Sequence, residues 1–288
     1  MIRIELAAWS DRGQRRELNE DRVFYQLLAT SDADPIAFCV VADGMGGRLA
    51  GEVASYWAVE TLRRGLADLF APTDPGQALL LQAKHVQTAL ASVGGSGRAS
   101  DRMIMQHIRD AATQANLAVR QYTLHRPNET LGAGSTATLV VLKGTRAYVA
   151  NVGDSRTYLF RGGRLMQLTR DHSLVANLIA DGRLSLADSF THPEAGVLTR
   201  CLGCEEEVQV DIEPHTLQPD DTLLLCSDGL WSTLRDPRTM SRILRRAHSL
   251  EEGAQALVDA ANRAGGKDNI AVGLVRIVAE RDLPADGA

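Results

Sequence analysis

Six acidic residues stand at the ends of segments that have the composition of β-strands: Glu20, Asp21, Asp43, Asp154, Asp228 and Asp268. The neighbouring segments, such as residues 22–28, 36–42 and 222–226, are rich in β-branched, aromatic or aliphatic side chains. Buried strands converge toward their neighbours, so residues at their ends can meet. We therefore expect these carboxylates to lie close together in the fold.

A cluster of like charges is unfavourable unless cations compensate it. No histidine or thiolate accompanies these acids, and oxygen ligands alone suit hard divalent ions such as Mg²⁺ or Mn²⁺. The plainer interpretation is that each acid caps a turn, because Asp-Gly is a common turn dipeptide. That interpretation holds well for any single acid but is hard to sustain for four or five together. The pattern predicts a divalent metal site.

Glycine and arginine add to this prediction. In VADGMGG, residues 41–47, three glycines leave the backbone around Asp43 open to a ligand. A glycine-rich turn can also hold phosphate, but the spacing matches neither GxxxxGK[ST] nor GxGxxG. Arg16 precedes Asp21 by five residues, near enough to place a guanidinium beside the acids. Its planar fork suits two phosphate oxygens, although alone it would be a solvated loop charge.

Strands and helices that must position these residues alternate in blocks. Residues 36–42 form a continuous apolar run, which is typical of a strand buried on both faces. Apolar residues recur at the helical period over 51–70 and 101–125. Residues 134–169 predict a meander of antiparallel strands divided by glycine turns. Segregated strands and helices favour an α+β fold over repeated βαβ units.

One domain over residues 1–279 is expected, followed by a short tail over 280–288. The stretch GGSGRAS, residues 94–100, has little to pack, so we predict an insertion over about residues 72–100.

Composition excludes several classes of protein. The 288 residues carry 31 basic and 36 acidic side chains, a formal charge of −5, which argues against a nucleic-acid partner. The longest apolar run, residues 36–42, is far shorter than the ~20 residues of a membrane span. No secretory signal pattern opens the sequence, so a cytoplasmic location is the default expectation.

Cysteine usage fits a reducing compartment, because four cysteines are too few for a disulfide scaffold. Cys39 and Cys226 sit in apolar runs and are expected to be buried free thiols. Cys201 and Cys204 form a CxxC, but no second ligand pair completes a zinc site. Two unpaired thiols are the favoured interpretation, and a redox pair is the alternative.

Eight segments, in order, resemble the signature set of the type 2C metal-dependent protein serine/threonine phosphatases, in a bacterial-like form. The resemblance covers residues 11–277 and rests on RRELNED, VADGMGG, GSTAT, VANVGDSR, LTRDHSLV, VLTRCLG, LLLCSDGLW and GGKDNIAV. Single motifs such as DG or GDSR are weak, whereas eight in order are specific.

The resemblance implies a four-layer α-β-β-α sandwich, two stacked and mostly antiparallel sheets flanked by helix pairs, with two Mn²⁺ or Mg²⁺ ions in a cleft. A water that bridges the metals would attack phosphoserine or phosphothreonine of a protein. Such an enzyme would be a monomer opposing a serine/threonine kinase. By motif position, Asp43 would bridge the metals, with Gly44, Asp228, Asp268 and Glu20 as further ligands; Asp21 and Asn269 would orient waters, and Arg16 would bind the phosphate.

Two departures from the family pattern matter. Met45 replaces a histidine that is a candidate general acid in many relatives, which leaves metal-bound water or another residue such as His172. Some relatives bind a third metal, for which Asp154 and Asp228 are present here but Ser232 replaces an acid. Binding of a third, weaker ion through waters is an alternative that the sequence leaves open.

Residues 171–200 correspond to the family's flap beside the cleft and are expected to tune substrate choice; a plain surface loop is the alternative. A second alternative is a catalytically weak phosphoprotein-binding module of the same fold, although every two-metal position is filled. A serine esterase built on GDS, residues 153–155, is weaker still, because no later Asp and His pair stands near the C-terminus.

Overall fold

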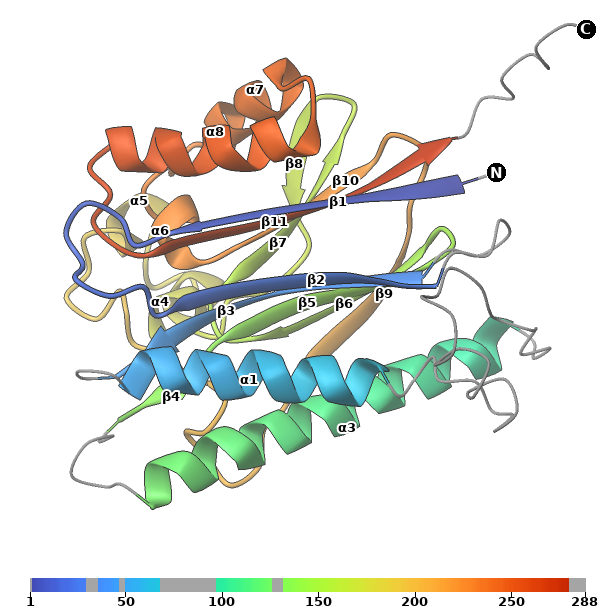
Figure 1. Ribbon diagram of the computed structural model, residues 1–288. Coiled ribbons are helices and arrows are strands. Elements are labelled where there is room, and N and C mark those ends of the chain that lie inside the picture. The colour runs from blue at the N-terminus through green and yellow to red at the C-terminus, as the bar shows by residue number, and fades with distance from the viewer. Residues whose placement is uncertain (1, 30–35, 47–49, 68–96, 126–131, 280–288) are drawn as a thin grey trace, which may run out of the picture.

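The computed structural model describes residues 2–29, 36–46, 50–67, 97–125 and 132–279, and these form four layers (Figure 1). Two sheets are stacked face to face, and a pair of helices covers the outer face of each sheet. Every strand pair in both sheets is antiparallel. The predicted α+β sandwich is confirmed.

Sheet A has five strands in the order β1-β11-β10-β7-β8. Its members come from both ends of the sequence: β1 (Ile2–Asp11), β7 (Arg156–Arg161), β8 (Arg164–Gln167), β10 (Thr222–Cys226) and β11 (Ile270–Ala279). The first and last strands therefore pair along their whole length, from Ile2 with Ala279 to Asp11 with Ile270.

Sheet B has six strands, with the path β2-β3-β5-β6-β9 and a short β4 paired to β3. Its members are β2 (Asp21–Ala29), β3 (Ile36–Met45), β4 (Gly134–Ser135), β5 (Ala137–Lys143), β6 (Arg146–Val152) and β9 (Asp211–Thr216). The predicted meander is therefore divided between the two sheets, because the chain crosses from β6 to β7 at the Gly153-Asp154 turn.

Helices α1 (Ala50–Ala67) and α3 (Gly97–Leu124) cover sheet B, and α7 (Pro237–Arg246) and α8 (Leu250–Arg263) cover sheet A. Shorter helices lie near one end of the sandwich: α4 (Leu174–Ala180), α5 (Leu186–Ser189) and α6 (Asp228–Trp231). No helix in these described ranges has the length and hydropathy needed to cross a bilayer.

Alternation along β3 explains why its sequence is continuously apolar. Phe38 and Val40 pack toward α1 and α3, whereas Cys39 and Val41 pack into the core between the sheets. Complete burial of one such side chain contributes about 1.5–3 kcal/mol. The strand is therefore held from both faces, as the sequence predicted.

The two sheets approach each other closely at Gly273 of β11. A Cβ atom there would lie 2.5 Å from the Cys39 sulfur of β3, so only glycine fits without a shift. Both Cys39 and Cys226 are free and buried, as predicted.

The helix after the predicted insertion starts earlier than expected. Residues 97–100, predicted to be flexible linker, form the first turn of α3. Most of the predicted insertion, residues 72–96, lies outside the described residues, as do the end of the first predicted helix, residues 68–70, and the predicted tail, 280–288.

Candidate active site

The predicted acids gather at the end of the sandwich where β3 and β10 finish and β2 and β11 begin. They line a cleft of 260 Å³, which we call the acidic cleft. Eight of the nine residues predicted for the site line it: Arg16, Glu20, Asp43, Gly44, Asp154, Asp228, Asp268 and Asn269. The ninth, Asp21, is buried beside the cleft and lines a separate groove next to α1.

Each sheet contributes a different part of the cleft. In sheet B, Asp21 lies directly opposite Asp43 in the β2–β3 register. In sheet A, Asp228 follows β10 and Asp268 precedes β11, and Ser227 ties these ends together through two hydrogen bonds with Ala271. Like charges opposite each other destabilise a strand pair, so this arrangement is a cost that a cation would relieve.

The backbone of Asp43 is fixed by the GSTAT segment. Its N–H donates to Thr136 Oγ1 at 3.0 Å, and its carbonyl accepts from the Thr136 N–H at 2.8 Å and from Ser135 Oγ at 3.1 Å. The sequence motif was recognisable, but its positioning role needed these distances.

Asn269 holds the loop that carries Glu20. Its Oδ1 accepts from the Glu20 N–H at 2.9 Å, and its Nδ2 donates to the Arg12 and Leu18 carbonyls at 2.9 and 2.8 Å. Both ends of the amide are therefore engaged by backbone groups. This arrangement supports a positioning role for Asn269, and the water-orienting role that the family resemblance implied stays a prediction.

Two glycines let Glu20 enter the cleft. A Cβ on Gly44 would lie 2.0 Å from the Gly51 carbonyl oxygen, and a Cβ on Gly51 would lie 2.5 Å from Glu20 Oε1. Larger residues would therefore separate the start of α1 from the end of β3. The carboxylate of Glu20 lies in the space that these glycines leave.

Burial and nearby negative charges raise the pKa values of Asp43, Asp154 and Asp228. Burial is the main cause for Asp43, and the charges of Asp21, Asp228, Asp154 and Asp268 raise its pKa further, well above the ordinary value. The same causes raise the pKa of Asp154 to about 8 and that of Asp228 to about 6. Protons or cations are therefore bound strongly here.

The donor set fits hard divalent cations. Glu20 Oε1 and Asp21 Oδ2 are buried and have no hydrogen-bond partner among the described residues. The negatively charged ligands that line the cleft are all carboxylates. Within the described ranges, no three acidic, histidine or cysteine side chains are arranged as a ready-made coordination shell for a metal ion. The carboxylate ligands and the burial of these two oxygens fit Mg²⁺ or Mn²⁺.

Among the described residues that line the acidic cleft, Arg16 is the only one with a cationic side chain. Its Nη2 donates to Asp268 Oδ2 at 2.7 Å, while 48% of the side chain stays exposed. Four of its five N–H groups remain available to a phosphate at the rim.

His172 does not face the acidic cleft. Its Nδ1 accepts from the Gly153 N–H at 3.1 Å, which leaves the proton on Nε2 to bond Asp211 Oδ2 at 3.0 Å. Burial lowers the pKa of His172. The sequence-based suggestion that His172 protonates the leaving group is therefore wrong, since both ring nitrogens serve as structural links.

One further candidate is settled by position. Ser155 is fully buried, and its hydroxyl lies 2.6 Å from Thr136 Oγ1, so it cannot serve as an exposed esterase nucleophile. Met45 lines the acidic cleft but has no proton to transfer.

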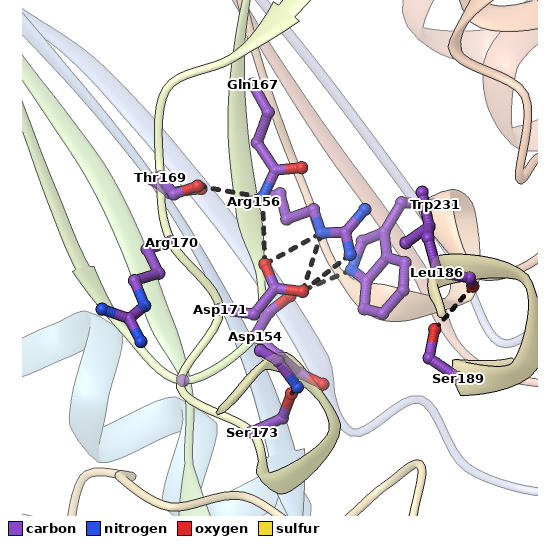
Figure 2. Close-up of polar contacts among 12 residues, drawn as sticks. Asp154, Arg156, Gln167, Thr169, Arg170, Asp171, Ser173, Leu186, Ser189 and Trp231 are labelled. Carbon is purple, nitrogen blue, oxygen red and sulfur yellow. Dashed lines mark hydrogen bonds and ion pairs between the residues drawn. The ribbon is translucent and has the colours of Figure 1, made fainter. Parts of the chain in front are cut away.

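The flap, residues 171–200, contains α4 and α5 and lines the acidic cleft with Gly196 and Leu198. Arg156 of β7 anchors its first residue: Nε and Nη2 donate to the Asp171 carboxylate at 2.9 and 2.6 Å (Figure 2). The guanidinium stacks on the Trp231 ring at 3.5 Å, and Trp231 Nε1 donates to the Asp154 carbonyl at 3.0 Å. Sequence reasoning missed this network, although Arg156 and Trp231 end two of the quoted motifs.

Cys201 and Cys204 form a disulfide, with Cα atoms 5.5 Å apart. The favoured interpretation of two unpaired thiols is therefore wrong. Gly203, at φ +86°, permits the tight turn, and Leu202 is held by two backbone hydrogen bonds with Ser135. This anchored turn brings the two sulfurs together.

Comparisons with known proteins indicate one family. Residues 12–262 match the family described as protein phosphatase 2C. The serine/threonine phosphatase stp of Listeria monocytogenes is 37% identical over 280 residues, which cover 96% of each chain. The serine/threonine protein phosphatase PstP of Mycobacterium tuberculosis is 30% identical over 277 residues, or 96% of this chain and 45% of that protein.

Solved structures show the same fold. A serine/threonine phosphatase of S. agalactiae superposes with a TM-score of 0.77 at 28% identity, covering 96% of this chain and all (100%) of the other. The catalytic domain of PstP, solved with two manganese ions, has a TM-score of 0.75 at 29% identity, covering 97% of this chain and 100% of that one.

Proposed function

The chain belongs to the protein phosphatase 2C family and is a serine/threonine protein phosphatase. We propose that the acidic cleft is its active site and that it uses two divalent cations to hydrolyse phosphoserine and phosphothreonine in proteins. One observation carries the proposal. Carboxylates from two different sheets gather in one cleft, partly or fully buried, and burial and neighbouring charges raise the pKa values of Asp43, Asp154 and Asp228. A fold tolerates this repulsion when the cluster has a cationic ligand.

Asp43 is assigned the bridging position between two Mn²⁺ or Mg²⁺ ions. The charges of four other acids raise the pKa of its carboxyl group, so Asp43 lies among acids from both sheets: Asp21, Asp154, Asp228 and Asp268. Asp228 and Asp268 would complete one metal site, and Glu20 with the Gly44 carbonyl would serve the other. Bound divalent ions of this kind lower the pKa of a water between them and neutralise phosphoryl oxygens.

Arg16 is assigned to the substrate phosphate. Its guanidinium lies at the rim, held at 2.7 Å from Asp268 and half exposed. A planar cation can donate two parallel hydrogen bonds to phosphoryl oxygens. Its ion pair with Asp268 would fix the orientation of that fork.

Asp21 and Asn269 are assigned to positioning. Asn269 fixes the Glu20 loop through hydrogen bonds with backbone groups. Asp21 lies opposite Asp43 on the neighbouring strand β2. A third, weaker ion near Asp154, Asp228 and Ser232 stays a prediction, as do the opposing kinase, the monomeric state and the cytoplasmic location.

Hydrolysis of a chromogenic aryl phosphate, with Mn²⁺ and with chelator, tests the proposal. We expect Mn²⁺-dependent turnover that Asp43→Asn abolishes, whereas Asp259→Asn, an exposed acid on α8, retains it. Equal activity in chelator, or turnover of acetyl esters only, would overturn the assignment. Binding of phosphopeptide without turnover would instead favour the catalytically weak module.

A further inference from the structure

A second cavity opens directly from the acidic cleft. It encloses 420 Å³ between the flap and the segment that runs from α6 to Arg235, and we call it the flap groove. Asp154, Gly196, Asp228 and Asp268 line both spaces. A peptide with its phosphate among the acids would therefore place its neighbouring residues in the flap groove.

The walls of the flap groove are apolar and aromatic. Val175 and Ile179 of α4 face the groove together with Phe190 and Trp231. The Trp231 ring is fixed by its hydrogen bond to the Asp154 carbonyl and by the Arg156 guanidinium stacked on it (Figure 2). Such a wall loses little side-chain entropy on binding, which favours recognition of a large apolar side chain.

Cations lie on the same groove. Arg235 and Lys267 line it and are exposed, and neither forms an ion pair within the described part of the chain. Arg235 donates only its Nε, to the Ser232 carbonyl at 3.1 Å, and its guanidinium covers Phe190 at 4.7 Å. The charge of Arg156, by contrast, is already paired with Asp171. Arg235 and Lys267 are therefore complementary to an acidic group.

We propose that the flap groove binds the residues next to the phosphorylated residue and selects a large apolar side chain together with an acidic one. The proposal rests on the proposed function of the acidic cleft. Because the groove is continuous with the acidic cleft, its occupant is the substrate chain itself. Arg235 and Lys267, which have no ion pair in the described part of the chain, would attract an acidic residue of the substrate. The fixed ring of Trp231 would contact an apolar residue of the substrate.

The test compares phosphopeptides of equal length. The parent peptide carries Leu beside the phosphothreonine and Glu in the following positions; one relative replaces Leu by Ser, and another replaces Glu by Lys. We expect kcat/KM to fall about tenfold on loss of Leu, from the transfer free energy of its side chain, and about fivefold on the Glu-to-Lys exchange, from surface ion pairing.

Variants at Arg235 separate this site from general effects. Arg235→Glu is expected to reverse the preference between the Glu and Lys peptides, whereas Arg235→Lys retains it. Arg238→Glu changes an exposed arginine of α7 outside the groove and should retain both the preference and the aryl phosphatase activity.

Two outcomes would overturn the proposal: equal kcat/KM for all three peptides, or an Arg235→Glu enzyme with the wild-type preference. Binding of a second copy of the chain or of a small molecule in the groove, with no effect of peptide sequence, would have the same result. Failure of the proposed function is distinct, because the wild-type enzyme would then hydrolyse neither the peptides nor an aryl phosphate with Mn²⁺.

Discussion

Replacement of Asp228 by asparagine is expected to stabilise the metal-free protein while it abolishes catalysis. The pKa of Asp228 is raised from 3.8 to about 6, first by burial and then by the charge of Asp268. At about pH 8 the ionised group therefore costs the fold about 3 kcal/mol, from roughly two pKa units at 1.36 kcal/mol each. Asparagine removes that cost but weakens the hydrogen bond from the Gly229 N–H, so a net gain of about 1–3 kcal/mol is expected.

The pH dependence of unfolding independently checks the sign of the stability change expected for Asp228→Asn. Because the folded pKa of Asp228 lies above the unfolded one, protonated Asp228 stabilises the fold at low pH, and this contribution is lost as the pH rises through about 6. The advantage of the variant should therefore be largest at about pH 8 and mostly disappear by about pH 4.5.

Thermal unfolding in chelator and in Mn²⁺ measures both effects. In chelator at about pH 8, Asp228→Asn should unfold about 2–6 °C above the wild type. In Mn²⁺ the order should reverse, because a ligand at 100 times its Kd stabilises its folded partner by about 2.7 kcal/mol. Asp259→Asn, which removes an exposed charge without partners in the described residues, should change neither melting temperature. A wild type at least as stable as the variant in chelator, or a gain independent of pH, would refute the reasoning.

Three further perturbations test separate parts of the structure. Arg16→Lys keeps the charge but loses the fork, so kcat/KM for an aryl phosphate should fall about tenfold, mainly through KM; an unchanged KM would remove Arg16 from phosphate binding. Asn269→Ala breaks three hydrogen bonds of the Glu20 loop and should raise the Mn²⁺ concentration for half-maximal activity about fivefold or more; an unchanged Mn²⁺ titration would contradict the positioning role. Leu225→Ala opens a cavity between the sheets and should cost about 2–5 kcal/mol in urea unfolding, whereas a loss under 1 kcal/mol would show that the sheets close around it.

The fold class and the members of the acidic cleft could be predicted because their signals are local. Continuous apolar strands and acids at their ends are visible in the sequence itself, as for residues 36–42 and Asp43. The register that sets Asp21 opposite Asp43 is not local, because it depends on how two strands align. Sequence reasoning therefore predicted a cluster but not its pairing.

The features that the sequence did not reveal arise where distant segments meet. Asn269 bonds to Arg12 and Leu18 from the other end of the chain, so its positioning role was not visible. The Cys201–Cys204 pairing depends on a turn that Ser135 anchors from another strand. The early start of α3 was missed because the glycine and serine that open it have weak helix propensity.

The division of the acidic cleft between two sheets makes the spacing of its ligands a property of the core between them. Gly273 and Cys39, which meet across that core, set how closely β11 approaches β3. A methyl group added at Gly273 would have to displace the Cys39 side chain or the strand that carries it, and a displacement of that strand would move Asp43 relative to Asp268 without touching either. Side-chain volume at this contact is therefore coupled to the geometry of the acidic cleft, although neither Gly273 nor Cys39 lines that cleft.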